Sequence, residues 1–165
     1  MTVRTCIPWP DKRLRMAAEL VEEITDEVRA IWQDMIDTME AMPGLGLGAP
    51  QIGVMKQLAV VDCSEERGQV IKLANPKVLH ASVKLRKHEE ASPNLPGVWA
   101  PIERPRAVTV QYLNEAGKIE ERDFVDVWAT SVQHQIDHLN GKMYFDHLSR
   151  TKRAMLIKKA QKKQG

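Results

Sequence analysis

Apolar residues recur at three- and four-residue steps in two parts of the chain, which is the spacing of one buried face of an α-helix. The first part predicts a helix over residues 26–42, because Thr25 can cap its start and Pro43-Gly44 stops it. The second helix ends at Asn140-Gly141, a common C-terminal signal. The apolar positions are Val28, Ile31, Trp32, Met35, Ile36 and Met39 in the first helix, and Val125, Trp128, Ala129, Val132, Ile136 and Leu139 in the second.

Shorter apolar or alternating runs between the helices predict β-strands. Residues 114–118 form a predicted hairpin turn between two of them. Residues 88–97 hold two prolines and a glycine within five positions, which excludes a helix and predicts an irregular segment. The expected strands lie at 58–61, 70–73, up to two within 77–87, one around 108–112 and one within 119–127.

The chain has 165 residues, of which 43% are hydrophobic and 28% charged, and this suits one globular domain over residues 1–165. No apolar run is long enough to span a bilayer, and the N-terminus lacks the apolar core of a signal peptide. We therefore expect a cytoplasmic protein that does not enter a membrane. Cys6 and Cys63 are too few for a disulfide framework, and their spacing does not indicate a metal site.

Basic residues gather at the C-terminus, where residues 150–165 hold seven Lys or Arg and no Asp or Glu. The whole chain has a net charge of +2, so the remainder carries −5 (+2 minus 7). We expect a basic C-terminal helix at about residues 149–163. This asymmetry indicates a polyanionic neighbour, although a solvated helix that only raises solubility has the same composition.

Residues 133–141 contain two histidines within the second predicted helix and read Q-H-Q-I-D-H-L-N-G. His134 and His138 stand four apart, so both imidazoles project from one helix face, where they can take adjacent corners of a metal's coordination sphere. Metallohydrolases with this geometry carry H-E-x-x-H, whose Glu is the general base. Gln135 holds that position here, and an amide does not take up a proton near neutral pH. The alternative is a surface helix with two solvated histidines.

Residues 44–51 are rich in glycine and read G-L-G-L-G-A-P-Q. Three alternate glycines allow the backbone to run close to a neighbouring strand or to a ligand. The segment is neither a dinucleotide fingerprint, because it follows a helix, nor a Walker loop, because no G-K-[ST] comes after it. Gln51 ends the run and offers a neutral side-chain donor.

Three segments in this order resemble the motifs of the peptide deformylase family. Residues 44–51 are similar to its G-x-G-x-A-A-x-Q, with Gly48 at the first Ala, and residues 90–94 stand where the family has E-G-C-x-S. Residues 134–138 stand where it has H-E-x-x-H, and P-D-K-R-L at residues 10–14 resembles its N-terminal P-D-x-R-L. The resemblance covers nearly the whole chain, and three ordered motifs are far more specific than any one of them.

The resemblance implies an α+β fold, in which short antiparallel sheets wrap around a central helix that carries His134 and His138, followed by a C-terminal helix. It also implies a reaction, the removal of the formyl group from the N-formyl-methionine of new chains. In that scheme one Cys and two His hold a divalent metal, usually iron, which activates a water. The Glu shuttles protons, and the first-motif Gln and the backbone N–H after the Cys hold the developing oxyanion.

Carried onto this sequence, the resemblance retains Gln51 as a catalytic residue and His134 and His138 as metal ligands. Ser92 stands at the third ligand position, where a neutral hydroxyl is a poor substitute for a thiolate. Gln135 stands at the position of the catalytic base. The site is therefore expected to hold metal weakly or not at all.

Further positions of the motifs also depart from the family pattern. Pro93 has no backbone N–H to donate, and Ala91 and Asn94 differ from the expected residues. The methionine pocket that the resemblance implies is polar here. The positions assigned to substrate binding are Leu45, Gly46, His88, Thr130 and Ser131.

We expect a deformylase-like protein with lost or vestigial activity and no tightly bound cofactor; if a metal binds, it is iron, nickel or zinc. The alternative is an active deformylase or amide hydrolase whose metal is held by the two histidines and a carboxylate, Glu89 or Glu90. A third interpretation is a structural or regulatory partner that uses neither groove nor metal. The expected partners are the N-terminal peptide of nascent chains and, through the basic C-terminal helix, the ribosome.

Overall fold

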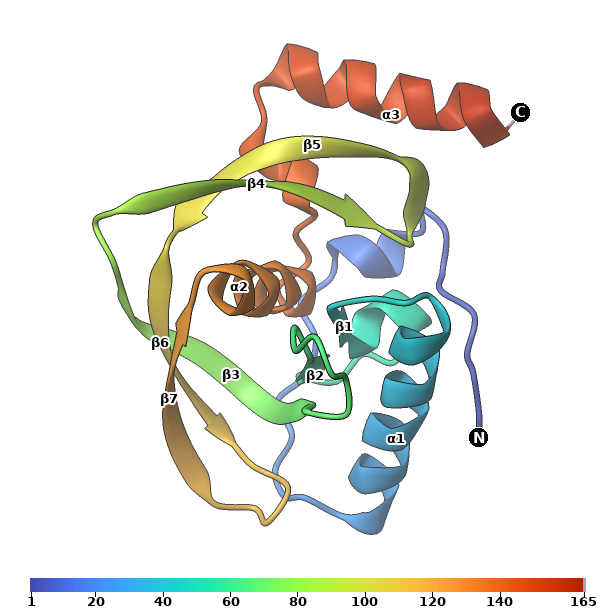
Figure 1. Ribbon diagram of the computed structural model, residues 1–165. Coiled ribbons are helices and arrows are strands. Elements are labelled where there is room, and N and C mark those ends of the chain that lie inside the picture. Colours follow the sequence, from blue (N-terminus) through green and yellow to red (C-terminus); the bar gives the residue numbers. More distant parts are fainter. Residues whose placement is uncertain (165) are drawn as a thin grey trace.

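The computed structural model describes residues 1–164 and has three α-helices and three short 3-10 helices (Figure 1). Both helices predicted from apolar periodicity are confirmed. Thr25 caps the first helix, because its Oγ1 accepts a hydrogen bond from the backbone N–H of Val28 at 3.2 Å. The helices are α1 (Asp26–Ala41), α2 (Val127–Leu139) and α3 (Arg150–Gln164), with η1 (Lys12–Arg15), η2 (Ala49–Ile52) and η3 (Tyr144–His147).

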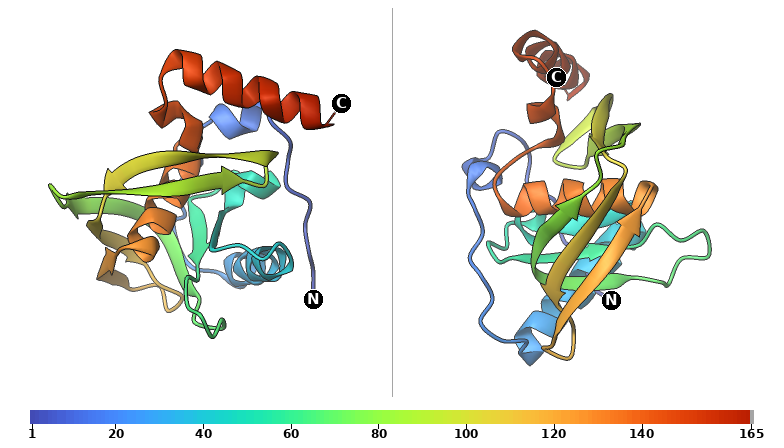
Figure 2. Two further views of the ribbon diagram at one scale, coloured as in Figure 1. Left: turned by 45° about the horizontal axis from the view of Figure 1, so that its top comes forward. Right: turned by 90° about the vertical axis from the view of Figure 1, so that its left-hand side faces the viewer.

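The strands of residues 1–164 form two antiparallel sheets. One has five strands in the order β1-β2-β3-β6-β7, and the other is the β4-β5 hairpin. Helix α2 lies between them (Figures 1 and 2), so the central helix that the resemblance implied is confirmed. The strands are β1 (Gly46–Gly48), β2 (Leu58–Val61), β3 (Ile71–Ala81), β4 (Leu85–Ser92), β5 (Leu95–Pro105), β6 (Ala107–Leu113) and β7 (Ile119–Val125).

Helix α2 is held in place by its apolar face, which packs on the five-stranded sheet. Val132 and Leu139 of α2 are fully buried in one cluster with Val110 and Phe124 of the sheet. Helix α1 covers β1 and β2 in a second cluster that is built around Trp32. The face of α2 that carries the histidines is thereby turned towards the β4-β5 hairpin.

The prediction of an irregular segment at residues 88–97 is wrong. Strands β4 and β5 run through these residues and meet in a turn at Pro93 and Asn94. Among the described residues, β5 pairs only with β4, so the other edge of β5 has no partner strand. Pro96, which lacks an N–H, is tolerated because that edge needs no hydrogen-bond donor. Strand β3 is also longer than expected and continues from 71 to 81. A register shift between Ala74 and Lys77, next to Pro76, interrupts the alternation of buried and exposed residues along β3. The sequence pattern therefore does not show one continuous strand.

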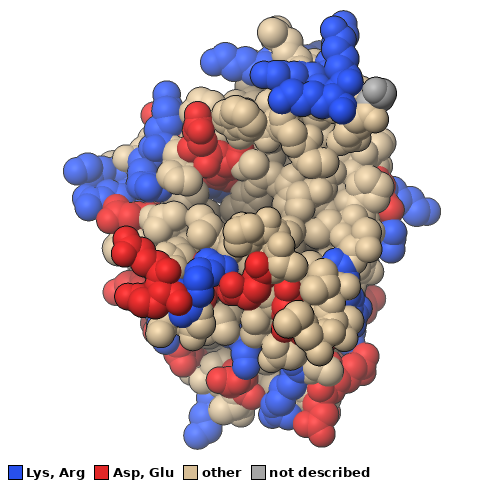
Figure 3. Space-filling view, turned by 45° about the vertical axis from the view of Figure 1, so that its right-hand side comes forward, with Lys and Arg blue, Asp and Glu red and all other residues tan. Residues whose placement is uncertain are grey.

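The C-terminal helix expected at about residues 149–163 is confirmed as α3, which packs on β5. Its residues Leu156, Ile157 and Ala160 join a third apolar cluster, and Lys163 Nζ donates to the carbonyl of Gly97 at 2.6 Å. Figure 3 shows Lys and Arg side chains gathered over this helix at the top of the molecule. Within residues 1–164, no helix combines the length and hydrophobicity needed to cross a membrane.

Candidate active site

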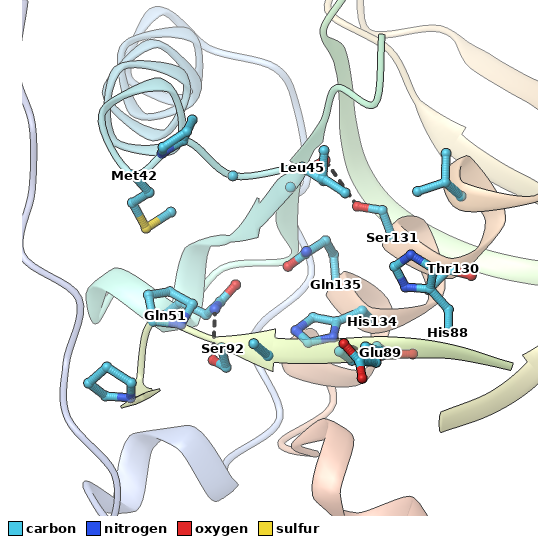
Figure 4. Close-up of a pocket in the computed structure, with 18 of the residues that line it drawn as sticks. Met42, Leu45, Gln51, His88, Glu89, Ser92, Thr130, Ser131, His134 and Gln135 are labelled. Atoms are coloured by element: carbon cyan, nitrogen blue, oxygen red, sulfur yellow. Dashed lines mark hydrogen bonds and ion pairs between the residues drawn. The ribbon is translucent and has the colours of Figure 1, made fainter. Parts of the chain in front are cut away.

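A pocket with a cavity volume of about 360 Å³ opens between β1, β4 and α2. Each of these elements contributes site residues that the sequence singled out, although they lie far apart along the chain. Figure 4 shows Gln51 and Ser92 at one end of the pocket and His88, Thr130 and Ser131 at the other. The predicted site residues that line the pocket are Leu45, Gly46, Gln51, His88, Ser92, Thr130, Ser131, His134 and Gln135. His138 lies one helical turn deeper, behind His134.

The two histidines are buried, with exposed fractions of 8% for His134 and 1% for His138, so the solvated alternative is wrong. Their Nε2 atoms are 3.2 Å apart. Two nitrogens on adjacent corners of a tetrahedral zinc site, with bonds of about 2.0–2.1 Å, are roughly 3.3 Å apart. The pair therefore keeps the spacing of two metal ligands.

A buried ion pair fixes the orientation of His134. Its Nδ1 lies 2.8 Å from Glu90 Oε1, and Arg104 donates to both oxygens of Glu90 at 2.7 and 2.9 Å. Burial raises the pKa of Glu90, but the hydrogen bonds from His134 and Arg104 outweigh burial and hold that pKa below its usual value. Glu90 is thus a charged acceptor, and the proton of His134 sits on Nδ1. The sequence missed both Glu90 in this role and Arg104.

The second contact of the histidine pair joins the two rings. Their Nε2 atoms face each other at 3.2 Å, within hydrogen-bond distance. Burial lowers the pKa of His138 well below its usual value, so this ring is neutral. Its Nδ1 is buried without a hydrogen-bond partner in the described part of the chain.

The third metal ligand is not replaced by an equivalent donor. Ser92 is 3% exposed, and its Oγ lies 3.1 Å from Asn94 Oδ1 and 3.5 Å from Gln51 Nε2. No cluster of three His, Cys, Asp or Glu side chains suited to a metal occurs in residues 1–164. Glu90 bonds the Nδ1 side of His134, opposite to the nitrogen that faces His138. Two imidazoles and a neutral hydroxyl do not fit the three-ligand site that the family resemblance implies.

Gln51 is committed to hydrogen bonds at both ends of its side-chain amide. Its Oε1 accepts from the backbone N–H of Gly48 at 2.9 Å, and its Nε2 donates to Asn94 Oδ1 at 2.8 Å. The amide nitrogen of Asn94 donates to the carbonyls of Ile7 at 2.6 Å and Gln51 at 3.0 Å. Asn94, which is 1% exposed, thus takes one of the two N–H donors of Gln51 and fixes the direction of the other, whose nearest acceptor is Ser92 Oγ at 3.5 Å. The sequence showed Asn94 only as a departure from a motif.

Gln135 lies in the pocket wall against β1. Its side chain is 4% exposed, and its Oε1 has no partner among the described residues. A Cβ added to Gly46 would lie 2.7 Å from both Gln135 Nε2 and Ser131 Oγ, so glycine permits this close approach without moving either side chain. The alternate glycines had suggested close approach to a strand or to a ligand, whereas Gly46 approaches side chains of α2.

The far end of the pocket is polar, as expected. Ser131 Oγ donates to the carbonyl of Leu45 at 3.0 Å, and Arg86 Nη1 donates to Thr130 Oγ1 at 3.0 Å. Thr130 and Ser131 are 6% and 7% exposed, so these hydroxyls form part of the buried wall. Arg86 was not singled out from the sequence, because its partner is on another element.

The fold and site define a class of small α+β proteins, in which antiparallel sheets enclose a helix whose histidine pair stands at an open pocket. Residues 3–154 match the family described as polypeptide deformylase, and the chain belongs to this family. It is 42% identical to the peptide deformylase of Methylocella silvestris, over 98% of this chain and 85% of that protein. The crystal structure of peptide deformylase from Ehrlichia chaffeensis matches with a TM-score of 0.93 and 34% identity, covering 99% of this chain and 97% of that one. A structure of the same enzyme in complex with actinonin matches with a TM-score of 0.92 and 36% identity, covering 99% and 98%.

Proposed function

We propose that this chain is a deformylase-family protein that binds the N-terminal segment of a peptide and has lost, or retains only vestigial, deformylase activity. The observation that carries the proposal is the bond from Gln51 Nε2 to Asn94 Oδ1 at 2.8 Å, because it takes one of the two N–H donors of this amide and fixes the direction of the other. Gln135 at the base position and Ser92 at the ligand position act in the same direction. The residue at the base position, Gln135, is an amide and does not take up a proton from water near neutral pH.

The pocket walls support binding of an extended peptide. In the described part of the chain, β1 pairs only with β2, and β4 pairs only with β5. The other edges of β1 and β4 belong to residues that line the pocket, including Gly46 and Glu89. Unpaired strand edges can take up an extended chain through main-chain hydrogen bonds. The related Ehrlichia chaffeensis enzyme was solved with actinonin, so a protein of this fold does accept a ligand.

The expected loss of rate is large. A general base contributes about 10²–10⁴ in rate, and one oxyanion donor contributes about 10²–10³. Loss of both lowers turnover by roughly 10⁴–10⁷, although such effects are not simply multiplicative. The missing third metal ligand should lower turnover further.

Turnover and binding measured side by side test this proposal. Wild-type protein is incubated with formyl-Met-Ala-Ser and added iron, nickel or zinc, and formate release is followed while peptide affinity is determined by calorimetry. We expect measurable binding with formate release at or near background, and little tightly bound metal by elemental analysis. Turnover close to that of an active relative would refute the loss of activity, and absence of any peptide binding would refute the binding role.

An active enzyme with an altered metal site is the second candidate, and the 3.2 Å spacing of the histidine Nε2 atoms favours it. Glu90 is already hydrogen-bonded to Arg104 and His134. Glu89 is exposed and lines the pocket, so it is the carboxylate that could serve as the third metal ligand. Close to one metal per purified chain, lost in Glu89→Gln but kept in Glu65→Gln, an exposed residue outside the pocket lining, would favour this candidate over the first.

We also propose that the protein works in the cytoplasm and that α3 contacts the ribosome. The support is the basic surface of this helix, whose lysines and arginines are exposed over most of its length (Figure 3). A peptide-binding pocket on a body that carries such a helix suits a partner of nascent chains.

A further inference from the structure

Polar groups that lack part of their hydrogen-bond partners gather at one end of the pocket, around His88 and Thr130 (Figure 4). Thr130 Oγ1 accepts from Arg86 Nη1 at 3.0 Å, so its own proton remains to be donated. That hydroxyl donates to no acceptor in residues 1–164, and the His88 ring, whose Nδ1 is buried, makes no hydrogen bond there. Buried polar groups normally have partners, so the unpaired His88 Nδ1 and the unused Thr130 proton point to a ligand.

The alternation of β4 explains why these groups lie together. Residues 86, 88, 90 and 92 share the strand face that is turned towards α2, and every one of them is polar. Glu90 is neutralised by Arg104, whereas Arg86 forms no direct ion pair with a described carboxylate, although its charge contributes to lowering the pKa of Asp126. Glu89 belongs to the opposite strand face and is exposed to solvent. The end of the pocket beside Thr130 therefore combines a cation that makes no direct ion pair with an unused hydroxyl proton.

We propose that this end of the pocket is a subsite for a first side chain that ends in a hydrogen-bond acceptor, a carboxamide or a carboxylate, rather than in a thioether. The proposal rests on the peptide-binding function given above and names the class of peptide. Gln and Glu side chains have nearly the length of Met, so they reach equally far into the pocket. Their terminal oxygen accepts from the Thr130 hydroxyl, which is positioned by Arg86. A thioether is a weak acceptor and leaves the buried donors unpaired.

Affinities of four formyl-X-Ala-Ser peptides test this subsite, with X as Gln, Glu, Met or norleucine. Calorimetry on the full chain should show Gln or Glu binding at least about tenfold more tightly than norleucine, which is the effect of one good buried hydrogen bond. Thr130→Val removes only the hydroxyl and should abolish this preference while norleucine affinity stays unchanged or rises. Thr109→Val is the matched control, because Thr109 Oγ1 donates to Asp123 on the outer strands at 2.6 Å.

Arg86→Met distinguishes the two acceptor classes. If the subsite recognises a carboxylate, Arg86→Met should lower the affinity for the Glu peptide more than that for the Gln peptide. Equal losses of affinity would assign the subsite to a neutral carboxamide. The subsite is refuted, with peptide binding left standing, if norleucine or Met peptides bind wild type as tightly as Gln and Glu peptides. If none of the four binds folded wild-type protein at millimolar concentration, the proposed function fails together with it. The wild-type series alone decides the question if a variant does not fold.

Discussion

Asn94 should prevent a restored active site from working, and this can be tested by stepwise reversion to the family motifs. The variant Ser92→Cys, Gln135→Glu, Pro93→Leu returns the thiolate, the base and the backbone N–H that the resemblance implies. It leaves one N–H of Gln51 Nε2 bonded to Asn94 Oδ1 at 2.8 Å, which fixes the direction of the second N–H. We therefore expect limited turnover in this triple variant, and a further gain of up to roughly 10²–10³ when Asn94→Ser lets the Gln51 amide turn towards the oxyanion.

The same substitution has a cost in stability that the structure allows us to estimate. Asn94 donates to the carbonyls of Ile7 and Gln51, and both bonds are lost when the shorter serine side chain replaces it. With the bond from Gln51 Nε2 to Asn94 Oδ1 these are three buried hydrogen bonds, so at about 1 kcal/mol for each the free energy of unfolding should fall by roughly 2–3 kcal/mol. Asn114→Ser, in the hairpin turn between β6 and β7, removes turn hydrogen bonds far from the pocket and controls for destabilisation without a gain in activity.

Formate release from formyl-Met-Ala-Ser, with added metal and at a temperature where every variant is folded, measures the series. Ser92→Cys alone should improve metal binding with little turnover, and Gln135→Glu alone should also do little, because ligand and base act as one unit. Full activity in the triple variant would refute the role assigned to Asn94. A quadruple variant that folds and binds metal without activity would instead place the defect in the polar end of the pocket.

Three further predictions follow from packing and charge. Gly46→Ala places a Cβ 2.7 Å from Gln135 Nε2 and should lower stability by about 1–3 kcal/mol in chemical denaturation, whereas Gly44→Ala, with its nearest atom at 3.4 Å, should change it little. Arg104→Met leaves Glu90 charged and buried and should lower stability by about 3–5 kcal/mol, while Arg106→Met breaks only an exposed pair and should leave Tm nearly unchanged. Association of α3 with ribosomes should weaken steeply with salt in co-sedimentation; unchanged binding from low to high salt would contradict an electrostatic contact, and no binding at any salt would favour a merely solvated helix.

Local patterns in the sequence were sufficient for the helices and for most of the sheet. Apolar periodicity located α1 and α2, and the turn signal at residues 114–118 located the β6-β7 hairpin. The same local signals failed at β4 and β5, because prolines normally argue against a strand. There Pro93 occupies the turn and Pro96 an edge strand, and neither position can be recognised before the pairing is known.

The contacts that decide the chemistry join residues far apart in the chain, and no local pattern reveals them. Glu90 and His134 are 44 positions apart, and Gln51 and Asn94 are 43 positions apart. The motif resemblance brought most of the pocket residues together correctly, but it describes each position by what the family has there. It therefore identified Asn94 as a departure and could not show that this side chain holds the Gln51 amide.

The departures from the family pattern are coupled to one another in the structure. Ser92 and Asn94 share one hydrogen-bond network with Gln51, and that network ties the β4-β5 turn to the first motif. Ser131 bonds the carbonyl of Leu45. Buried polar groups that lose one partner cost more free energy than a typical hydrogen bond contributes, so a single reversion leaves its neighbours unsatisfied. The altered residues thus support each other as a hydrogen-bonded pocket wall, and we expect a combined reversion of ligand, base and donor positions to be tolerated better than any single one.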